Sequence, residues 1–169
     1  SRHAYTEIDS IQCQGLSRIF KISANTVDCT RLDINALMPL WSGGIPDNRA
    51  EALIALLTDE DHFWRPSGVT LVSAQDPNYD PTSANGGGGT WLFWTTALGE
   101  GLLDYGRHDI VTEMLRRILN VQAQVLDIDN ELTEFYHSDE PHGLGEKDYL
   151  SGIVPLHLLT RVLGVYTVS

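Results

Sequence analysis

The chain has 169 residues, with 11 Lys or Arg against 23 Asp or Glu, so its formal net charge is −12. This acidic balance argues against a nucleic-acid partner and against an anionic membrane surface, because both need clustered basic side chains. Hydrophobic residues make up 42% of the chain, which is enough for the core of a single domain over residues 1–169, and no run of 18 apolar residues predicts a transmembrane helix.

The two cysteines, Cys13 and Cys29, fit no zinc-binding pattern, since the sequence has no Cys-x-x-Cys. A disulfide between them and two free thiols in a reducing compartment both agree with the sequence. Free thiols are favoured, and with them a cytoplasmic protein, because the first residues also lack the pattern of a signal peptide.

The first half of the chain gives one clear helix. Residues 10–22 have apolar positions at roughly helical spacing, but Gly15 interrupts them, and residues 33–40 are apolar and lead to a turn at residues 43–46. Residues 47–58 are predicted to form a helix that Asp47 caps. The apolar stripe of this helix is Ala50, Leu53, Ile54 and Leu57.

Residues 59–90 are predicted to be a long loop, because three prolines exclude long helices and residues 86–89 are four consecutive glycines. A loop of this length inside a compact domain is usually functional. Its aromatic side chains also need somewhere to pack, and these are Phe63, Trp64 and Tyr79.

Three more helices are predicted over residues 91–105, 109–126 and 148–165. The first ends at Gly106, and the short link to the second favours an antiparallel αα-hairpin. The acidic segment 127–145 is predicted to be a loop with one short turn. Leu150 is placed on the core side of the last helix, which Pro155 should kink. The predicted fold class is therefore all-α, with helical hairpins joined by long loops.

Residues 130–143 are the most informative for chemistry, because they bring carboxylates, a Tyr and two His together between predicted helices. Loops on a rigid scaffold often carry binding and catalytic residues. A carboxylate beside aromatic rings is partly desolvated, which suits it to general acid or base chemistry. The competing interpretation is a solvated acidic linker.

Metal binding is a weaker alternative. Residues 127–131 resemble a calcium loop but lack its spacing and its Gly. His137 and His142 are five residues apart, whereas a zinc pair on a helix has i, i+4 spacing. We therefore expect no metal site.

The glycine run 86–89 opens a predicted helix, where backbone amides can hold an anion. A phosphate loop would need a Lys after the glycines and a strand before them, so the glycines are better explained by close approach of the backbone to a ligand or a packed neighbour. Trp91 and Trp94 then share one helical face, as core residues or as a platform for sugar stacking.

Several segments follow one family pattern in order and spacing. They are Pro39-Leu40-Trp41-Ser42-Gly43, residues 49–53, Phe63-Trp64, residues 68–73, residues 88–91, residues 101–106, Thr133-Glu134-Phe135-Tyr136, and then Gly143, Tyr149, Gly152 and Pro155. This order resembles the C-terminal part of the (α/α)6-toroid glycoside hydrolases of family 63, which includes processing α-glucosidase and mannosylglycerate hydrolase, and of the related family 37 trehalases. The resemblance covers residues 38–169 and leaves residues 1–37 poorly matched.

The resemblance implies an inverting hydrolase, in which a carboxylic acid protonates the glycosidic oxygen and a carboxylate base activates water. The family's base is the Glu of a Glu-x-Tyr signature. Glu134-Phe135-Tyr136 matches it, so Glu134 is the candidate general base. The expected substrate is an α-linked glucoside, mannoside or similar small glycoside, and this chemistry needs no cofactor.

The resemblance also implies a sugar pocket. Gly88 and Trp91 match a Gly-x-x-Trp motif close to the sugar, although Gly89 stands where the family commonly has Pro. Trp41 and Trp64 would help to wall the pocket. The other candidates for substrate binding are Tyr136, His137 and His142.

The family's general acid is an Asp far upstream of the base, which a chain of this size does not reach. Asp33 has a remotely similar position, but its sequence context does not match. The predicted helices make about three hairpins, or half of a toroid, and the open flank of a half-toroid is apolar. The chain would then be part of a larger hydrolase completed by a complementary chain, a self-associating protein, or a non-catalytic carbohydrate-binding or helical interaction fragment.

Overall fold

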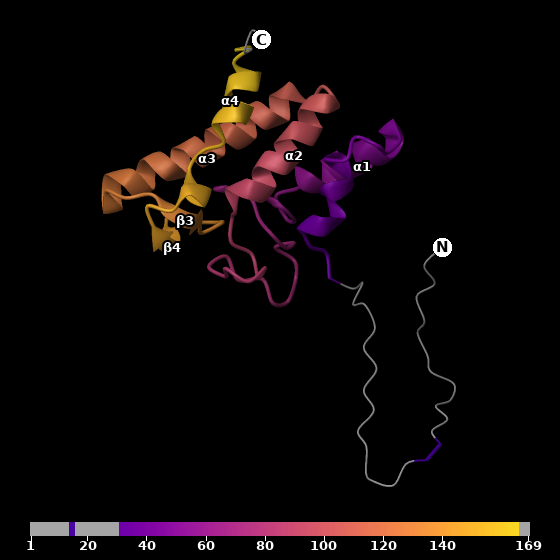
Figure 1. Cartoon of the computed structure of the whole chain (residues 1–169), viewed down its shortest axis with the longest axis horizontal. Helices are drawn as coiled ribbons and strands as arrows, with labels where there is room; N and C mark the ends of the chain where they lie inside the picture. Colours follow the sequence, from indigo (N-terminus) through magenta and orange to yellow (C-terminus); the bar gives the residue numbers. More distant parts are fainter. Residues whose placement is uncertain (1–13, 16–30, 166–169) are drawn as a thin grey trace. The chain divides into compact units, whose positions relative to one another are not determined.

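The computed structural model describes residues 14–15 and 31–165. The chain divides into two compact units, Ser1–Arg31 and Leu32–Ser169, and all the helices and strands given below belong to the second (Figure 1). Both cysteines, and most of the weak helical signal over residues 10–22, lie outside the described residues.

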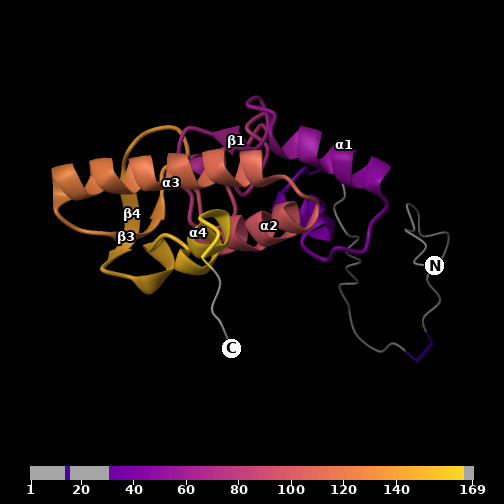
Figure 2. The ribbon, with the colours of Figure 1, turned by 90° about the horizontal axis from the view of Figure 1, so that it is seen from above.

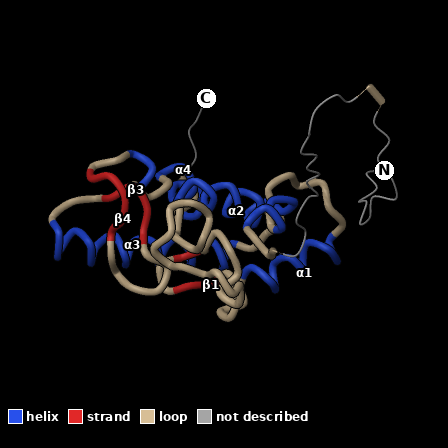
Figure 3. Tube along the Cα trace, turned by 90° about the horizontal axis from the view of Figure 1, so that it is seen from below, coloured by secondary structure: helices blue, strands red, loops and turns tan. Residues whose placement is uncertain are grey.

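The second unit is rich in helix, which confirms the predicted all-α class. Its α-helices are α1 (Asp47–Leu57), α2 (Leu92–Asp104), α3 (His108–Asp129) and α4 (Leu156–Val162), and its 3-10 helices are η1 (Ile34–Ala36), η2 (Met38–Leu40) and η3 (Leu150–Gly152). Two small antiparallel sheets pair β1 (Trp64–Arg65) with β2 (Gly68–Val69) and β3 (Thr133–Tyr136) with β4 (Gly143–Lys147). Figure 3 shows these strands as short segments among the helices. No helix of the described residues has the length and apolarity that a membrane crossing requires.

The α2–α3 pair is the predicted αα-hairpin, and the two helices run side by side in Figure 2. Gly106 ends the first helix at a φ of +73°, a conformation that glycine adopts without strain. The buried face of α3 holds Ile110, Val111, Met114, Leu115, Ile118, Val121, Gln122 and Val125. The helix runs three residues beyond the predicted end, because the chain leaves it only at Asn130, which is left-handed with a φ of 57°.

Helix α1 confirms the predicted helix to within one residue at its end, and Ala50, Ile54 and Leu57 are buried. The predicted cap is wrong, since Asp47 is the first helical residue and Pro46 is the N-cap. An acidic side chain in the first turn still complements the positive end of the helix dipole.

The predicted loop 59–90 contains the β1–β2 ribbon and is tied to the rest of the unit. Thr70 bridges to Thr90, and Asp33 bridges to Val72. Phe63 is fully buried and Trp64 is 6% exposed. Phe63 and Trp64 therefore pack into the core, as the aromatic residues of the loop suggested, whereas Tyr79 is half-buried.

Two predicted elements are wrong. Residues 127–145 are not simply a loop with one short turn, since the end of α3 and then the β3–β4 hairpin occupy them. The predicted helix 148–165 is η3, an extended residue Ile153 and then α4, with Pro155 as the N-cap of α4. Proline disfavours helical geometry in the residue before it, so Pro155 starts a short helix where a kink in a long one was predicted.

Candidate active site on the β3–β4 hairpin

The candidate base Glu134 lies on β3 opposite an irregularity in β4. Thr133 pairs with Lys147 and Phe135 pairs with Leu144, so Glu134 alone faces two residues of β4. The extra residue is accommodated at Gly145, whose φ is +80°, as in a bulge that needs glycine in the left-handed region. Bulges of this kind redirect side chains and are common beside active sites.

The bulge also holds the carboxylate of Glu134. The backbone N–H of Glu146 donates to Oε2 of Glu134 at 3.3 Å. A Cβ at Gly145 would lie 2.5 Å from the same oxygen, so only glycine leaves room for this arrangement. Ser151 Oγ donates to the Glu134 carbonyl oxygen at 2.9 Å. The residue is fixed at its backbone and at one oxygen, while its side chain remains half-buried.

An aromatic pair lies next to this carboxylate in the sequence and in the sheet. Two backbone hydrogen bonds of 2.8 and 3.0 Å join Thr90 to Tyr136, which brings the start of α2 beside β3. The rings of Trp91 and Phe135 then stack, with centroids 4.9 Å apart and an interplanar angle of 2°. The indole Nε1 of Trp91 is buried and has no hydrogen-bond partner within the described residues. A buried donor of this kind favours an acceptor that the chain itself does not supply.

Gly88 is buried and acts through its backbone. Its carbonyl oxygen accepts hydrogen bonds from the hydroxyls of Thr70 and Ser138. A Cβ at Gly88 would lie 2.7 Å from the ring of Tyr79, and its φ of +150° also favours glycine. The glycine run thus brings the backbone against packed neighbours, which is one of the two explanations that the sequence left open.

Tyr136, the last residue of β3, is fully buried. Its hydroxyl donates to the carbonyl oxygen of Gly152 at 2.7 Å, and the side-chain amide of Gln122 donates to the same carbonyl at 2.5 Å. Burial raises the pKa of this phenol. In this structure the Tyr136 hydroxyl therefore links β3 to η3, and the predicted contact of Tyr136 with sugar stays a prediction.

The two histidines of the candidate site lie in the loop between β3 and β4. His137 is half-buried, and its Nδ1 accepts the backbone N–H groups of Asp139 at 3.1 Å and Glu140 at 3.0 Å. The exposed ring of His142 lies 6.0 Å from that of His137, and its Nδ1 is 3.3 Å from a carboxylate oxygen of Glu140. This arrangement leaves Nε2 of both rings without a partner within the described residues.

The two remaining tryptophans of the candidate site differ in exposure. Trp41 ends η2 and is 56% exposed. Trp64 is buried under the guanidinium of Arg117, which lies 4.9 Å from its ring centroid. Trp64 lines a cavity of about 420 Å³ whose lining includes neither Glu134 nor Trp91. Glu134 and Tyr136 therefore lie on β3, Trp91 reaches this strand through its stack on Phe135, and Trp64 lies at a different feature.

The sequence did not predict a polar network centred on Asp139. Arg65 Nε donates to Asp139 Oδ1 at 2.6 Å, and the Tyr79 hydroxyl donates to Oδ2 at 3.0 Å. Burial and the charge of Asp139 raise the pKa of Tyr79 to about 12. The network ties the loop after β3 to β1 and to the long loop 59–90. Asp139 lay in the acidic segment that the sequence singled out, but no local pattern names partners so far away in the chain.

Within the described ranges, no group of three or more His, Cys, Asp or Glu side chains could hold a metal ion. The chemistry on the hairpin consists of a half-buried carboxylate, a stacked aromatic pair and an imidazole nitrogen. These groups can activate a water and bind a polyhydroxylated ligand.

Comparison with known proteins gives a family and a fold. The sequence pattern of the mannosylglycerate hydrolase MGH1-like glycoside hydrolase domain matches residues 22–150. The chain resembles the GH63 mannosylglycerate hydrolase from Thermus thermophilus in complex with glucose, at 16% identity over 84% of this chain and 30% of that chain, with a TM-score of 0.60. The complex of that enzyme with Tris gives 20% identity over 69% and 27% of the two chains, with a TM-score of 0.58. A structure described as a sialidase gives 13% identity over 78% and 13%, with a TM-score of 0.60.

No curated protein matches the chain. At these identities the solved structures show the fold alone, and the chain spans less than a third of the length of each of them. The fold they share is consistent with αα-hairpins that form part of a toroid. The family pattern extends over more than half of the chain. The chain therefore belongs to the family of mannosylglycerate hydrolase MGH1-like glycoside hydrolase domains.

Proposed function

We propose that this chain carries the general-base half of an inverting glycoside hydrolase site, with Glu134 as the base. The observation that carries the proposal is the carboxylate of Glu134, which the N–H of Glu146 holds over Gly145 while the side chain stays half-buried. A general base must be fixed in place and within reach of water. In the proposed step this carboxylate takes a proton from the water that attacks the anomeric carbon, and an acid protonates the departing oxygen.

The proposed substrate is an α-linked glucoside, mannoside or similar small glycoside, and the reaction needs no cofactor. The membership of the family supports a carbohydrate substrate. The stack of Trp91 on Phe135 offers an aromatic surface, and the unpartnered Nε1 of Trp91 suits a sugar hydroxyl. His137, His142, Trp41, Trp64, Tyr136 and the Gly88 backbone stay proposed contacts with the sugar.

The proposed reaction also needs a general acid. Asp33 is not proposed for this role, because its side chain accepts the backbone N–H of Asn35 at 2.9 Å and caps η1. We propose instead that residues 1–169 are the C-terminal portion of a larger (α/α)6 catalytic domain, whose other portion supplies the acid. The length of the solved structures that share the fold supports this proposal. A complementary chain or self-association would then cover the exposed apolar flank.

The test compares Glu134→Gln with Glu146→Gln in the protein as the cell makes it, on α-linked gluco- and manno-configured substrates. Both changes remove one carboxylate from the same hairpin, but only the first removes the proposed base. We expect Glu134→Gln to lower kcat by about 10²–10⁴-fold and Glu146→Gln to leave it nearly unchanged. Proton NMR of the first-formed product should show the β-anomer.

Equal activity of the two variants would show that Glu134 is not the base, and an α-anomer would exclude inversion. If the unaltered protein binds these sugars in calorimetry but releases none, the chain is a non-catalytic carbohydrate-binding fragment. Unchanged tryptophan fluorescence with every sugar would contradict both functions.

A further inference from the structure

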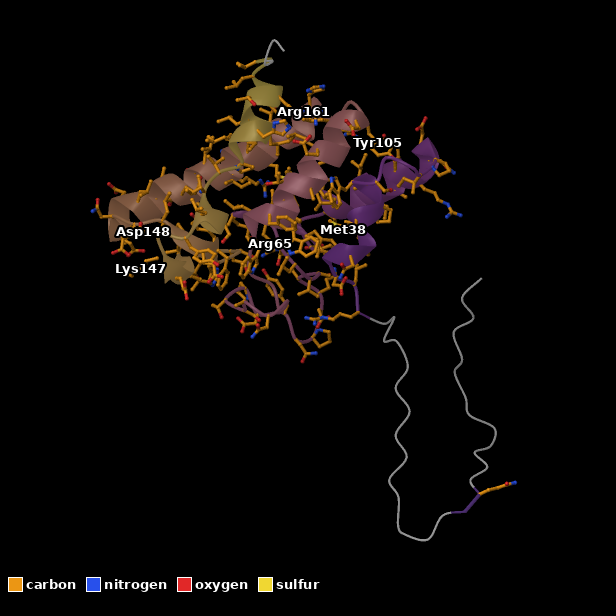
Figure 4. All side chains as sticks on the ribbon, viewed as in Figure 1. Met38, Arg65, Tyr105, Lys147, Asp148 and Arg161 are labelled. Carbon is orange, nitrogen blue, oxygen red and sulfur yellow. The ribbon has the colours of Figure 1, made fainter. Side chains whose placement is uncertain are left out.

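The cavity of about 420 Å³ beside α3 and β1 concentrates basic side chains in an acidic protein. Its lining includes Arg65, Arg116 and Arg117, together with Trp64 and Glu60. These three arginines belong to the 11 basic side chains of a chain whose net charge is −12. In Figure 4, Arg65 lies well apart from Lys147 at the end of the β3–β4 hairpin. The lining includes neither Glu134 nor Trp91, so the base proposed above does not lie in this cavity.

The guanidinium of Arg117 is held in place on several sides. It lies 4.9 Å from the Trp64 ring centroid, its Nη1 donates to the Arg65 carbonyl oxygen at 2.9 Å, and its Nε donates to Glu113 at 2.9 Å. Arg65 is fixed by Asp139 at 2.6 Å. The side chains of Arg65 and Arg117 are only 24% and 17% exposed. Binding a ligand here would cost little side-chain entropy, because these donors are already ordered.

The residues that line the cavity include more basic than acidic side chains. Glu113 and Asp139 pair with the arginines but do not line the cavity, and Glu60 is the single acidic residue in its lining. Arg116 is 67% exposed and uses Nε and Nη2 for Glu113, so its Nη1 has no partner in the described part of the chain. The lining itself therefore holds three guanidinium groups and one carboxylate, while the other two carboxylates that pair with these guanidinium groups lie outside it.

We propose that this cavity binds a small oxyanion, a carboxylate or a phosphate, through Arg116 and Arg117. Planar guanidinium groups match pairs of oxygens on such ligands and give strong charge-assisted hydrogen bonds. The volume falls in the range of about 300–1,000 Å³ that is usual for small-molecule sites. The carboxylate of Glu60, which is 73% exposed and 3.1 Å from Nη2 of Arg117, occupies part of the site and is displaced when the ligand binds.

The test is calorimetric titration of the whole chain with inorganic phosphate and, separately, with malonate at low ionic strength. Arg116→Gln should weaken binding by about tenfold, the loss expected for one charge-assisted contact. Glu60→Gln should tighten binding several-fold, because it removes the resident competitor. Arg49→Gln is the matched control, since it removes the same charge from an exposed position on α1 that does not line the cavity, and it should leave binding unchanged.

Saturable 1:1 binding of either probe with this order of variants supports the site, and the probe that binds identifies the ligand as a phosphate or a carboxylate. Absence of saturable binding of both probes at millimolar concentration would overturn the proposal. Equal weakening by Arg116→Gln and Arg49→Gln would also overturn it, because that result indicates general attraction by charge. These outcomes do not depend on the role of Glu134.

Discussion

At the scale of single residues, two glycines differ in why a larger residue is excluded: one for its backbone conformation, the other also for steric crowding at the site. Gly145 and Gly106 have similar φ values of +80° and +73°. A Cβ at Gly106 would meet nothing within 4 Å, whereas one at Gly145 would lie 2.5 Å from Oε2 and 2.8 Å from Cβ of Glu134. The first glycine is needed for its conformation alone, and the second is needed also for the space that it leaves to the proposed base.

Replacing each of these glycines by alanine should therefore lower the free energy of unfolding by a different amount. Gly106→Ala should lower the free energy of unfolding by about 1 kcal/mol, the cost of left-handed geometry in a residue with a Cβ. Gly145→Ala should lower it by roughly 2–4 kcal/mol, because overpacking is added to that strain. Urea unfolding measures both values. Equal losses of unfolding free energy in the two variants would mean that the hairpin accommodates the added Cβ at no cost and that the bulge does not hold Glu134.

At the scale of elements, α3 joins the parts of the unit on both of its sides. Its buried face packs in the core. On its polar face, Glu113 pairs with both Arg116 and Arg117. The guanidinium of Arg117 also donates a hydrogen bond to the Arg65 carbonyl oxygen in β1. The hydrogen bond from Arg116 is the largest cause that lowers the pKa of Glu113 to about 2, and the hydrogen bond from Arg117 and the charges of both arginines add to it against the opposing effect of burial. The stability of the helix therefore depends on pH through the protonation of this carboxylate.

The Glu113 pair should stabilise the fold above the ordinary pKa of a glutamate and lose this effect as the pH falls toward 2. The sign follows because the folded state holds the proton less tightly than the unfolded state does. At pH 7, Glu113→Gln should cost about 0.5–1 kcal/mol, the range for pairs that solvent screens. Urea unfolding of both proteins from pH 7 to pH 2 checks this. A difference that stays constant with pH would contradict it.

At the scale of the molecule, apolar side chains on the last described segment remain exposed. Leu150, Leu156 and Leu163 are 81%, 63% and 67% exposed. Contiguous exposed apolar surface on soluble proteins commonly marks an interaction site. The predicted long helix would have placed Leu150 on its core side, so the interruption before Pro155 changes which side chains are left for a partner.

The chain on its own should consequently self-associate at micromolar concentration. Replacing Leu150, Leu156 and Leu163 together by Ser should restore a monomer of 18.7 kDa, because the change removes the three most exposed apolar side chains of that segment. Sedimentation velocity measures the mass of each species. The same triple change is not expected to unfold the chain, since none of the three side chains is buried. A monomeric unaltered chain would contradict the proposed association.

The sequence predicts the parts of this molecule that depend on local patterns. The apolar stripe of α3 and the glycine at 106 define the α2–α3 hairpin, because helix periodicity and chain reversal are local. The β3–β4 hairpin was missed, since its strands are short and its bulge breaks the alternation of side chains. At the site, the Glu-x-Tyr signature singles out Glu134, but the contact of Asp139 with Arg65 joins residues 74 positions apart. Long-range contacts of this kind have no local signal.

The two backbone hydrogen bonds between Thr90 and Tyr136 join the chain just before α2 to the strand that follows α3. The α2–α3 hairpin is therefore an arm whose two ends are held together at its base. Its base lies at the candidate site, and its turn at residues 105–107 lies at the far end of a 13-residue helix, about 20 Å away along the axis. Whole helical turns added to both helices at that tip would lengthen the arm without moving its base. The register between Trp91 and Phe135 is therefore set at the base of the hairpin and does not depend on the length of its two helices.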